Sequence, residues 1–559
     1  MNARPRLLAG LATLLLAAIA LAGCGMPTAG PVVAGPALGE VDPDYVVSPS
    51  GPAEGASPEE ILGGFMLAVR APQADYQIAR QFLARGFADE WNPDAGVAIR
   101  AGIAEIRESG DSSAPQPVWR YEFVMSASVD ADGRYREQSP PSPRVAEFAF
   151  VQEDGQWRIS SAPDGIVLGA VAFTRAFAAV PLYYFDPAFR YLVPDLRWFA
   201  SRGSTPSRAV AALLNGPDAW LNRVLVSEFP PGTAVGAGGV VVSEGRAVVD
   251  LTAQAATADG RRLDRMRQQL AATLGMPDVE LRAAGVALAP DSSGPLATID
   301  PQPSGAVLVG TADDFGFGTA SGIVQIEGVT EHIVADGAVA VTLAQDARSA
   351  AYLAEDGTVR YVSADDDQPT VIDDRAGLLA PALDHYGFVW TVDAGPGSRI
   401  EAYDRLGQPV GLAVESLPTD AAIVSIAMSR DDTRLLVATR SGLGSRILIY
   451  GVERQDGVPT LLRQPLELPA PSGELLAAAW VNDRSIVAST AASGERIWVL
   501  PIGAPSHELG QLVVGAQLVG GRDGVPGIRA LVEGSVMAAS SDGGWNGTGL
   551  TASFLGVQQ

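Results

Sequence analysis

Few side chains in this sequence are suited to acid–base or nucleophilic chemistry. The 559 residues include one cysteine, Cys24, three histidines that lie far apart (His332, His385 and His507), and no lysine. Without lysine, neither a Walker A phosphate loop nor Schiff-base chemistry is available. No His-Glu-x-x-His or Gly-x-Ser-x-Gly motif occurs either, which argues against a zinc protease or an α/β-hydrolase. We therefore expect no catalytic residue, no cofactor and no metal ion.

Acidic residues offer the remaining polar candidates. The run 365–367 and the pair 373–374 could bind calcium, but acidic turns in solvent explain them better. Asp250 alternates with apolar neighbours, so it could face solvent, accept a structural hydrogen bond or bind a ligand. Asp89 and Glu90 are expected in a solvated turn. The paired carboxylates of a glycosidase could come from distant loops, although the sequence identifies no such pair.

Cys24 lies where a lipid anchor would be attached. Arg4 and Arg6 precede the apolar stretch Leu7–Ala20, which is followed by Leu21–Cys24, the layout of a secretory signal. The apolar stretch is too short to span a bilayer. Leu-Ala-Gly-Cys resembles the lipobox of bacterial lipoproteins, which implies removal of a signal peptide, residues 1–23, and acylation of Cys24. The alternative is an ordinary cysteine behind a plain signal peptide.

The composition indicates a folded, exported and acidic protein. The apolar content of 47% suits a chain with several buried cores, and the formal net charge is −25. Removal of Arg4 and Arg6 with the signal peptide lowers that charge from −25 to −27. A nucleic-acid-binding surface needs a basic patch, so nucleic acid is not an expected partner. We expect the protein on the extracytoplasmic face of the cell membrane, held by its lipid.

A tether and the start of a first domain follow the anchor. Residues 24–57 are rich in Pro, Gly, Ala and Ser, which predicts an extended linker. A helix is predicted to begin after Ser57, because a capping serine, Pro58 and the acids Glu59 and Glu60 suit the first turn of a helix.

The first domain is expected over residues 58–175 with an α+β fold. A second helix is predicted through Tyr76, Ala79, Phe82 and Leu83, and alternating strands follow. The strands are expected in 119–129 and 145–159, with hairpin turns at 131–133 and 153–155. Helices followed by an antiparallel sheet resemble the cone-shaped fold of nuclear-transport-factor-like proteins.

The second domain is expected over residues 178–298 as an α/β sandwich with one helical layer. The predicted elements are a helix at 208–215, a strand at 247–251, a helix through 266–274 and a last strand after Met276. Its segments Tyr184–Asp186, Ala209–Pro217, Pro231–Thr233 and Val248–Leu251 resemble, in this order, the GerMN domain of spore-germination and lipoprotein families.

Short strands separated by acidic or glycine turns recur every 40 to 50 residues from 305 to 559. This period is typical of a β-propeller, here with five or six blades. The clearest units are 339–362, 423–450 and 476–500, and the units around 383–390 and 513–531 are degenerate. The turn Ser429–Thr433 is similar to the Ser-x-Asp-Gly turn of bacterial propellers, although no glycine follows its aspartates.

The order of lipobox, tether, cone-like domain, GerMN domain and propeller resembles the LpqB family of actinobacterial lipoproteins over the whole mature chain. This resemblance implies an accessory lipoprotein of the MtrA/MtrB two-component system. Its partner would be the extracytoplasmic sensor domain of an MtrB-type histidine kinase, with a role in cell-wall homeostasis and division. The family supplies no catalytic residues.

Two alternatives remain open. One is a cell-envelope glycan-binding or glycan-processing propeller protein, which an exposed cluster of tryptophans with paired acids on one propeller face would favour. The residues to inspect for such a cluster are Trp390, Trp480, Trp498 and Trp545, of which Trp480 and Trp498 are expected in the core. The other alternative is a purely structural envelope protein.

Overall fold

The computed structural model describes residues 49–110, 116–395, 397–492, 494–513 and 515–559. These residues belong to one compact unit, Val46–Gln559. Cys24, the predicted signal peptide 1–23 and most of the predicted tether lie outside the described residues. Within the described residues, no helix is both long and apolar enough to cross a membrane.

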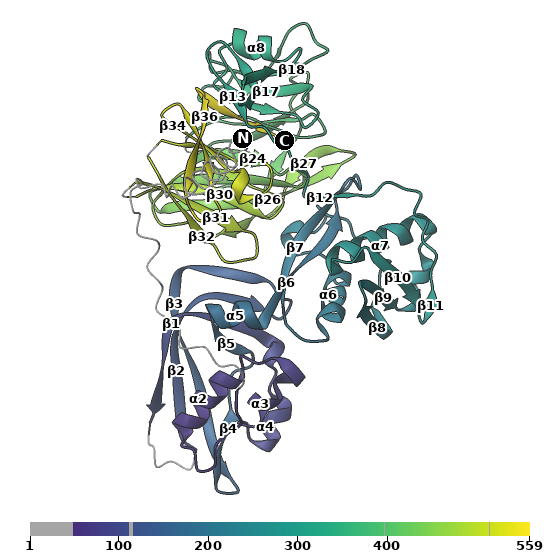
Figure 1. Ribbon diagram of the computed structural model, residues 1–559, viewed down its shortest axis with the longest axis vertical. Helices are drawn as coiled ribbons and strands as arrows, with labels where there is room; N and C mark the ends of the chain where they lie inside the picture. The colour runs from purple at the N-terminus through teal and green to yellow at the C-terminus, as the bar shows by residue number, and fades with distance from the viewer. Residues whose placement is uncertain (1–48, 111–115, 396, 493, 514) are drawn as a thin grey trace, which may run out of the picture. The chain divides into compact units, whose positions relative to one another are not determined.

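The N-terminal region pairs short helices with a sheet of long strands (Figure 1). The helix α2 (Pro58–Ala68) begins after Ser57 as predicted, and Ser57 forms a capping box with Glu60. The Ser57 N–H donates to Glu60 Oε2 at 2.8 Å, and the Glu60 N–H donates to Ser57 Oγ at 3.3 Å. Both bonds satisfy amides that the first turn of a helix leaves free. Ile61, Leu62 and Phe65 turn into the core.

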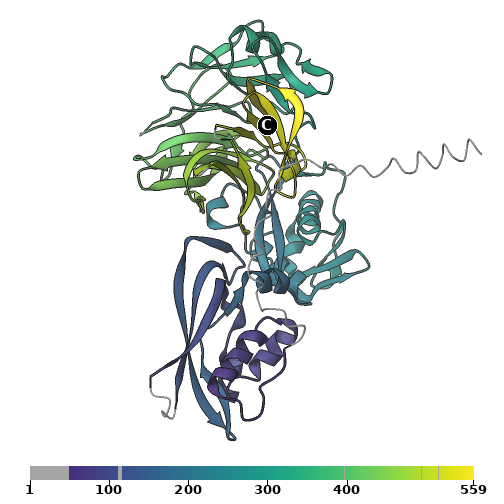
Figure 2. The same ribbon diagram turned by 60° about the vertical axis from the view of Figure 1, so that its left-hand side comes forward.

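Five strands form the N-terminal sheet, in the order β4-β3-β2-β1-β5. Figure 2 shows the helices beside this sheet. The strands are β1 (Gly96–Ser109), β2 (Val118–Asp130), β3 (Tyr135–Glu153), β4 (Gln156–Ser161) and β5 (Ile166–Gly169). The other helical elements are the 3₁₀ helices Gln73–Tyr76 and Pro93–Ala95, α3 (Gln77–Arg80), α4 (Arg85–Glu90) and α5 (Ala170–Ala176). Both predicted hairpin turns are confirmed. Gly133 at φ +82° is required in the first, because a Cβ there would lie 2.8 Å from the Trp198 carbonyl oxygen.

The predicted second helix is wrong in its extent. Tyr76 has a left-handed backbone (φ 56°), and only Gln77–Arg80 is α-helical. Phe82 and Leu83 lie beyond the helix end, where the Phe82 carbonyl accepts a bond from the Ile159 N–H at 2.9 Å. The apolar spacing that suggested a helix instead reflects burial of these side chains against β4.

The middle region has two sheets and two helices around one core. The strands β6 (Phe177–Phe185) and β7 (Tyr191–Ala200) are antiparallel, and β12 (Thr298–Ile299) pairs with β7. The second sheet contains β8 (Val235–Ser243), β9 (Arg246–Leu251), β10 (Asp278–Ala283) and β11 (Val286–Ala287). The helices are α6 (Thr205–Leu214) and α7 (Gly260–Leu274), with 3₁₀ turns at Ala219–Leu221 and Ala253–Thr257. Side chains of both sheets and both helices share the core, including Leu182, Val210, Val249, Met266 and Leu270.

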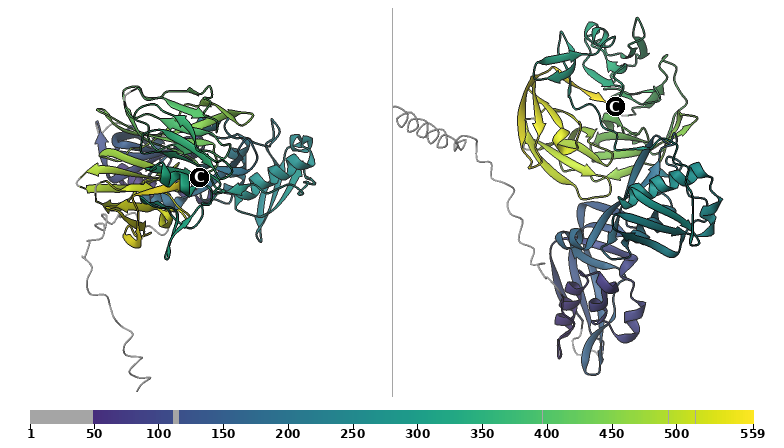
Figure 3. Two further views of the ribbon diagram at one scale, coloured as in Figure 1. Left: turned by 90° about the horizontal axis from the view of Figure 1, so that it is seen from above. Right: turned by 45° about the vertical axis from the view of Figure 1, so that its right-hand side comes forward.

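The C-terminal region consists almost entirely of short antiparallel strands, and the right-hand view of Figure 3 shows them grouped around a ring. The first elements are β13 (Leu308–Gly310), β14 (Phe315–Thr319), β15 (Gly322–Gln325), α8 (Thr330–Ala335), β16 (Ala340–Leu343), β17 (Ser349–Leu353), β18 (Val359–Ser363) and β19 (Thr370–Asp373). Next come β20 (Ala382–Leu383), β21 (Val389–Val392), β22 (Ile400–Tyr403), β23 (Ala413–Val414), β24 (Ala422–Met428), β25 (Arg434–Ser441), β26 (Gly444–Gln455), β27 (Val458–Leu462) and β28 (Leu466–Leu468). The last are β29 (Glu474–Trp480), β30 (Ser485–Ala492), β31 (Gly494–Pro501), β32 (His507–Leu512), β33 (Gln517–Val519), a 3₁₀ turn Val525–Gly527, β34 (Arg529–Val532), β35 (Ser535–Ala539), β36 (Trp545–Thr551) and β37 (Phe554–Gln558).

The strand β37 closes the ring. It pairs antiparallel with β13 and parallel with β16, so it joins the first strands of the C-terminal region to the last. The Ser304 N–H donates to Gln558 Oε1 at 2.7 Å, a bond between residues 254 apart in the sequence. Ring closure leaves no free edge at this point of the sheet.

Polar contacts connect the three regions. Arg202 in the middle region pairs with Asp94 of the N-terminal region at 2.9 Å. The Trp198 indole N–H donates to the Gly503 carbonyl oxygen at 2.8 Å, which links the middle and C-terminal regions. Ser506 Oγ donates to Glu137 Oε2 at 2.6 Å and links the C-terminal region to the N-terminal sheet.

Candidate functional site

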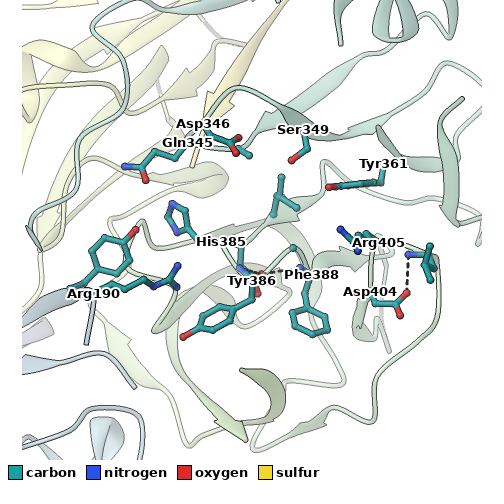
Figure 4. Close-up of a pocket in the computed structure, with 16 residues that line it drawn as sticks. Arg190, Gln345, Asp346, Ser349, Tyr361, His385, Tyr386, Phe388, Asp404 and Arg405 are labelled. Atoms are coloured by element: carbon teal, nitrogen blue, oxygen red, sulfur yellow. Dashed lines mark hydrogen bonds between the residues drawn. The ribbon is translucent and has the colours of Figure 1, made fainter. Parts of the chain in front are cut away.

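A pocket of about 690 Å³ lies where turns of the C-terminal region meet the start of β7 (Figure 4). Two successive sheets contribute: the first supplies the β16–β17 turn, and the second supplies the β20–β21 turn and the turn after β22. The lining side chains are Arg190, Tyr191, Ala344, Gln345, Asp346, Ser349, Tyr361, Leu383, Asp384, His385, Tyr386, Phe388, Asp404, Arg405 and Leu406, together with Gly387. A pocket of this size with aromatic walls and several charged groups is suited to a small molecule.

His385 and Asp432 form a buried pair at the inner wall. His385 Nδ1 lies 2.9 Å from Asp432 Oδ2, and both side chains are at least nine-tenths buried. The His385 backbone N–H also donates to the same carboxylate at 3.2 Å. Burial alone lowers the pKa of His385, but the hydrogen bond and charge of Asp432 outweigh it, so the pKa lies above its ordinary value. The other ring nitrogen, Nε2, is buried and has no hydrogen-bond partner among the described residues.

Asp384 fixes the turn that carries His385. Its Oδ1 accepts the backbone N–H of Tyr386 at 3.0 Å and that of Phe388 at 2.9 Å. Its Oδ2 accepts the Trp390 indole N–H at 3.0 Å and Arg454 Nη2 at 2.7 Å. With exposed fractions of 0% for Asp384 and 2% for Arg454, this ion pair is fully desolvated. Separating the two side chains would leave a buried charge without compensation, which is costly, so the pair keeps its geometry.

Asp432 is positioned by the turn between β24 and β25. The Asp431 carboxylate accepts Ser429 Oγ at 2.8 Å and the Thr433 N–H at 3.0 Å, and it also pairs with Arg434. Asp432 itself has a left-handed backbone (φ 62°). It therefore takes the conformation that the glycine of a Ser-x-Asp-Gly turn would adopt, which confirms the similarity expected from the sequence.

The middle region contributes Arg190 and Tyr191. The buried Asp186 accepts the backbone N–H of Arg190 and that of Tyr191, both at 2.6 Å, and so shapes the β6–β7 turn. Arg190 Nη2 lies 3.4 Å from Asp432 Oδ2, and its guanidinium lies 4.8 Å from the centre of the Tyr386 ring. The Tyr191 and His385 rings are 5.6 Å apart. The Tyr-Phe-Asp motif thus has a structural role in presenting two side chains to the pocket.

The three histidines do not come together, and among them His385 forms a buried pair with Asp432. His332 lies in α8 and its Nε2 is 3.8 Å from Glu331. His507 is exposed at the start of β32. Among the described residues, no group of three or more His, Cys, Asp or Glu could hold a metal ion.

Two acids singled out in the sequence serve the fold. Asp250 is buried, and its two carboxylate oxygens accept the backbone N–H of Gly238 at 2.9 Å and of Gly285 at 2.8 Å. These bonds lower the pKa of Asp250. Asp373 was expected in a solvated turn, but it is buried and accepts bonds from Arg375 at 2.8 Å and Thr391 Oγ1 at 2.6 Å.

The four tryptophans considered for glycan binding form no exposed cluster. Trp390 is fully buried with its N–H on Asp384, and Trp480 is buried with its N–H on the Ala427 carbonyl at 3.0 Å. Trp498 and Trp545 are half-buried. The aromatic side chains at the pocket are instead tyrosines and Phe388, which the sequence did not single out.

Three family models match successive parts of the chain. Residues 51–174 match the N-terminal domain of lipoprotein LpqB, residues 181–287 match a sporulation and spore germination domain, and residues 318–548 match the LpqB β-propeller domain. The chain is therefore a multidomain protein with a spore-germination-type domain followed by a β-propeller.

The chain belongs to the lipoprotein LpqB family. It is 28% identical to the Streptomyces coelicolor lipoprotein LpqB over 84% of this chain and 84% of that protein. It is 32% identical to the Cutibacterium acnes protein over 44% of this chain, and 31% identical to the Thermobifida fusca protein over 49% of this chain. Those two alignments span 41% and 45% of the relatives' own lengths.

Proposed function

We propose that the chain is a lipid-anchored accessory protein on the extracytoplasmic face of the membrane, where it modulates an MtrB-type sensor kinase in cell-wall homeostasis and division. The observation that carries this proposal is membership of the LpqB lipoprotein family together with a lipobox ending at Cys24. The extracytoplasmic sensor domain of the kinase is the proposed partner.

The anchor gives this proposal a physical basis. Acylation of Cys24 would confine the protein to the membrane surface, which raises its effective concentration near a membrane-bound kinase. One acyl chain binds a bilayer only marginally and two bind stably, because each buried CH₂ contributes about 0.8 kcal/mol. Binding would then shift the kinase toward whichever of its two states the accessory protein binds more tightly.

We further propose a division into a cone-like domain at 58–175, a GerMN domain at 178–298 and a propeller at 305–559. Six groups of strands support a six-bladed ring, one of them formed by β37 with β13, β14 and β15.

In-cell crosslinking with identification of the captured proteins tests the proposal. Amine-reactive reagents are unsuitable because the chain has no lysine, so a photo-crosslinking residue should replace an exposed side chain such as Leu443, which is 94% exposed. Capture of the sensor kinase by the wild-type protein, and its loss with Cys24→Ser, is the expected result.

The controls separate anchoring from contact. Cys24→Ser should leave an unprocessed precursor without lipid, whereas Ala22→Gly, which keeps a small residue before Cys24, should be processed and should capture the kinase normally. A Cys24→Ser protein that is processed and membrane-bound would show that Cys24 is not the anchor. Capture of glycan-turnover proteins alone, with no kinase, would contradict the signalling role.

A further inference from the structure

The lining of the pocket includes one cationic group that the fold leaves available. Arg405 is exposed, and among the described residues it has no ion-pair partner. The Arg190 side chain is 40% exposed but is already engaged, since it pairs with Asp432 at 3.4 Å and lies over the Tyr386 ring. A guanidinium presents paired N–H donors that match the two oxygens of a carboxylate or a phosphate.

The lining of the pocket also includes free acceptors for hydroxyl groups. Asp404 Oδ1 accepts the backbone N–H of Leu406 and that of Gln408, each at 2.9 Å, while Oδ2 has no hydrogen bond among the described residues. In the same way, Asp346 Oδ1 accepts the Arg348 backbone N–H at 2.9 Å, while its Oδ2 has no hydrogen bond among the described residues. The exposed Gln345 amide beside Asp346 adds a donor and an acceptor.

Aromatic rings complete the lining. Tyr361, Tyr386 and Phe388 belong to the pocket, and Figure 4 shows Tyr361 near Arg405, with the Tyr386 ring on the far side of Phe388. Tyr386 is held in place by Arg454, whose guanidinium lies 4.4 Å from its ring centre. A fixed ring offers an apolar face with a polar tip, which suits the C–H face of a sugar ring.

We propose that this pocket binds an acidic saccharide, meaning a sugar that carries a carboxylate or a phosphate. Arg405 would bind the anionic group, and the free oxygens of Asp404 and Asp346 would accept sugar hydroxyls. These side chains are available, because the buried pairs Asp384–Arg454 and His385–Asp432 satisfy the charges behind them. A plain anion would not use the carboxylate acceptors, and a neutral sugar would not use the Arg405 guanidinium. The volume of about 690 Å³ accommodates one or two sugar units.

Saturation-transfer NMR on the whole mature protein in detergent tests this proposal. The probes are glucuronate and glucose 6-phosphate, compared with glucose, acetate and inorganic phosphate. At least one charged sugar should bind with a Kd in the millimolar range, about tenfold more tightly than glucose and than its matching plain anion. The two charged probes distinguish a carboxylate ligand from a phosphate ligand.

Two variants locate the binding. Arg405→Gln should weaken the charged sugar about tenfold and leave glucose unchanged. Asp404→Asn keeps Oδ1 for the two backbone N–H groups and replaces only the free acceptor, so the turn should persist while every sugar binds more weakly. Arg399→Gln is the matched control, because Arg399 is 73% exposed on the same sheet but does not line the pocket.

The proposal is wrong if neither charged sugar binds, or if Arg405→Gln binds as tightly as the wild type. Equal affinity for glucose 6-phosphate and inorganic phosphate would indicate a simple anion site and would also overturn it. Thermal unfolding of each variant verifies folding, and a variant that unfolds early is replaced by Arg405→Lys, which should retain charge but lose the paired donors.

Discussion

Asp483 should make the folded protein less stable as the pH rises from about 4 to about 6, and Asp483→Asn should remove this loss. Asp483 lies in the turn between β29 and β30, where it is 6% exposed. Its Oδ2 is buried without a hydrogen-bond partner among the described residues. Burial, and then the negative charge of Asp300, raise the pKa of Asp483 from 3.8 to about 6.

The sign and size of the effect follow from proton binding. The unfolded chain releases this proton near its ordinary pKa of 3.8, whereas the folded protein keeps it until about pH 6. In that window the folded state binds more protons, so the free energy of unfolding falls as the pH rises. A difference of about two pKa units at 1.36 kcal/mol each corresponds to about 3 kcal/mol, which is lost in full above about pH 7.

Urea unfolding at pH 4 and pH 8 measures this loss. Asp483→Asn has the shape of the protonated acid, so it should match the wild type at pH 4 and exceed its stability at pH 8 by up to about 3 kcal/mol. Asp523→Asn, a change at a side chain that is 79% exposed, should match the wild type at both pH values. A stability difference between Asp483→Asn and the wild type that does not vary with pH would refute the reasoning.

Two further substitutions test the buried Asp384–Arg454 ion pair and the helix cap at Ser57. Arg454→Met should lower the free energy of unfolding by about 3–5 kcal/mol in urea unfolding, because it leaves the buried Asp384 carboxylate without its cation, and adding Asp384→Asn should recover part of the loss. A loss below about 1 kcal/mol, the size of an exposed ion pair, would contradict the burial of this pair. Ser57→Ala should cost about 1 kcal/mol and speed hydrogen exchange in the first turn of α2, whereas Ser57→Asp should keep most of the protection. Unchanged exchange in Ser57→Ala would mean that packing alone fixes the start of this helix.

Local features of the fold could be predicted because their causes are local in the sequence. The capping box of α2 needs only residues 57 to 60, and the two hairpin turns of the N-terminal sheet are specified by Asp and Gly. The second helix was predicted wrongly, since burial of Phe82 and Leu83 against a distant strand produces the same spacing as a helix. Asp250 could not be assigned, because its partners are backbone groups 12 residues away in β8 and 35 residues away in the β10–β11 turn.

The candidate site depended on long-range pairing and therefore could not be predicted. His385 and Asp432 are 47 residues apart, and Asp384 and Arg454 are 70 residues apart. Histidines isolated from one another in the sequence gave no indication of a partner. The available signal was the run Asp384–Tyr386, which places three polar or aromatic residues in a short turn between two buried strands.

Ring closure by β37 has a consequence for how an exported chain folds. The partners Ser304 and Gln558 are 254 residues apart, so on the proposed extracytoplasmic route the edge of β13 would stay open until all the sequence between them has crossed the membrane. Pairing over such a distance is intrinsically slow, and an unpaired edge strand is prone to associate with other chains. The anchored end would thus reach its final place while the far side of the ring is still unfinished, and protection of that open edge during export becomes a requirement for producing the protein.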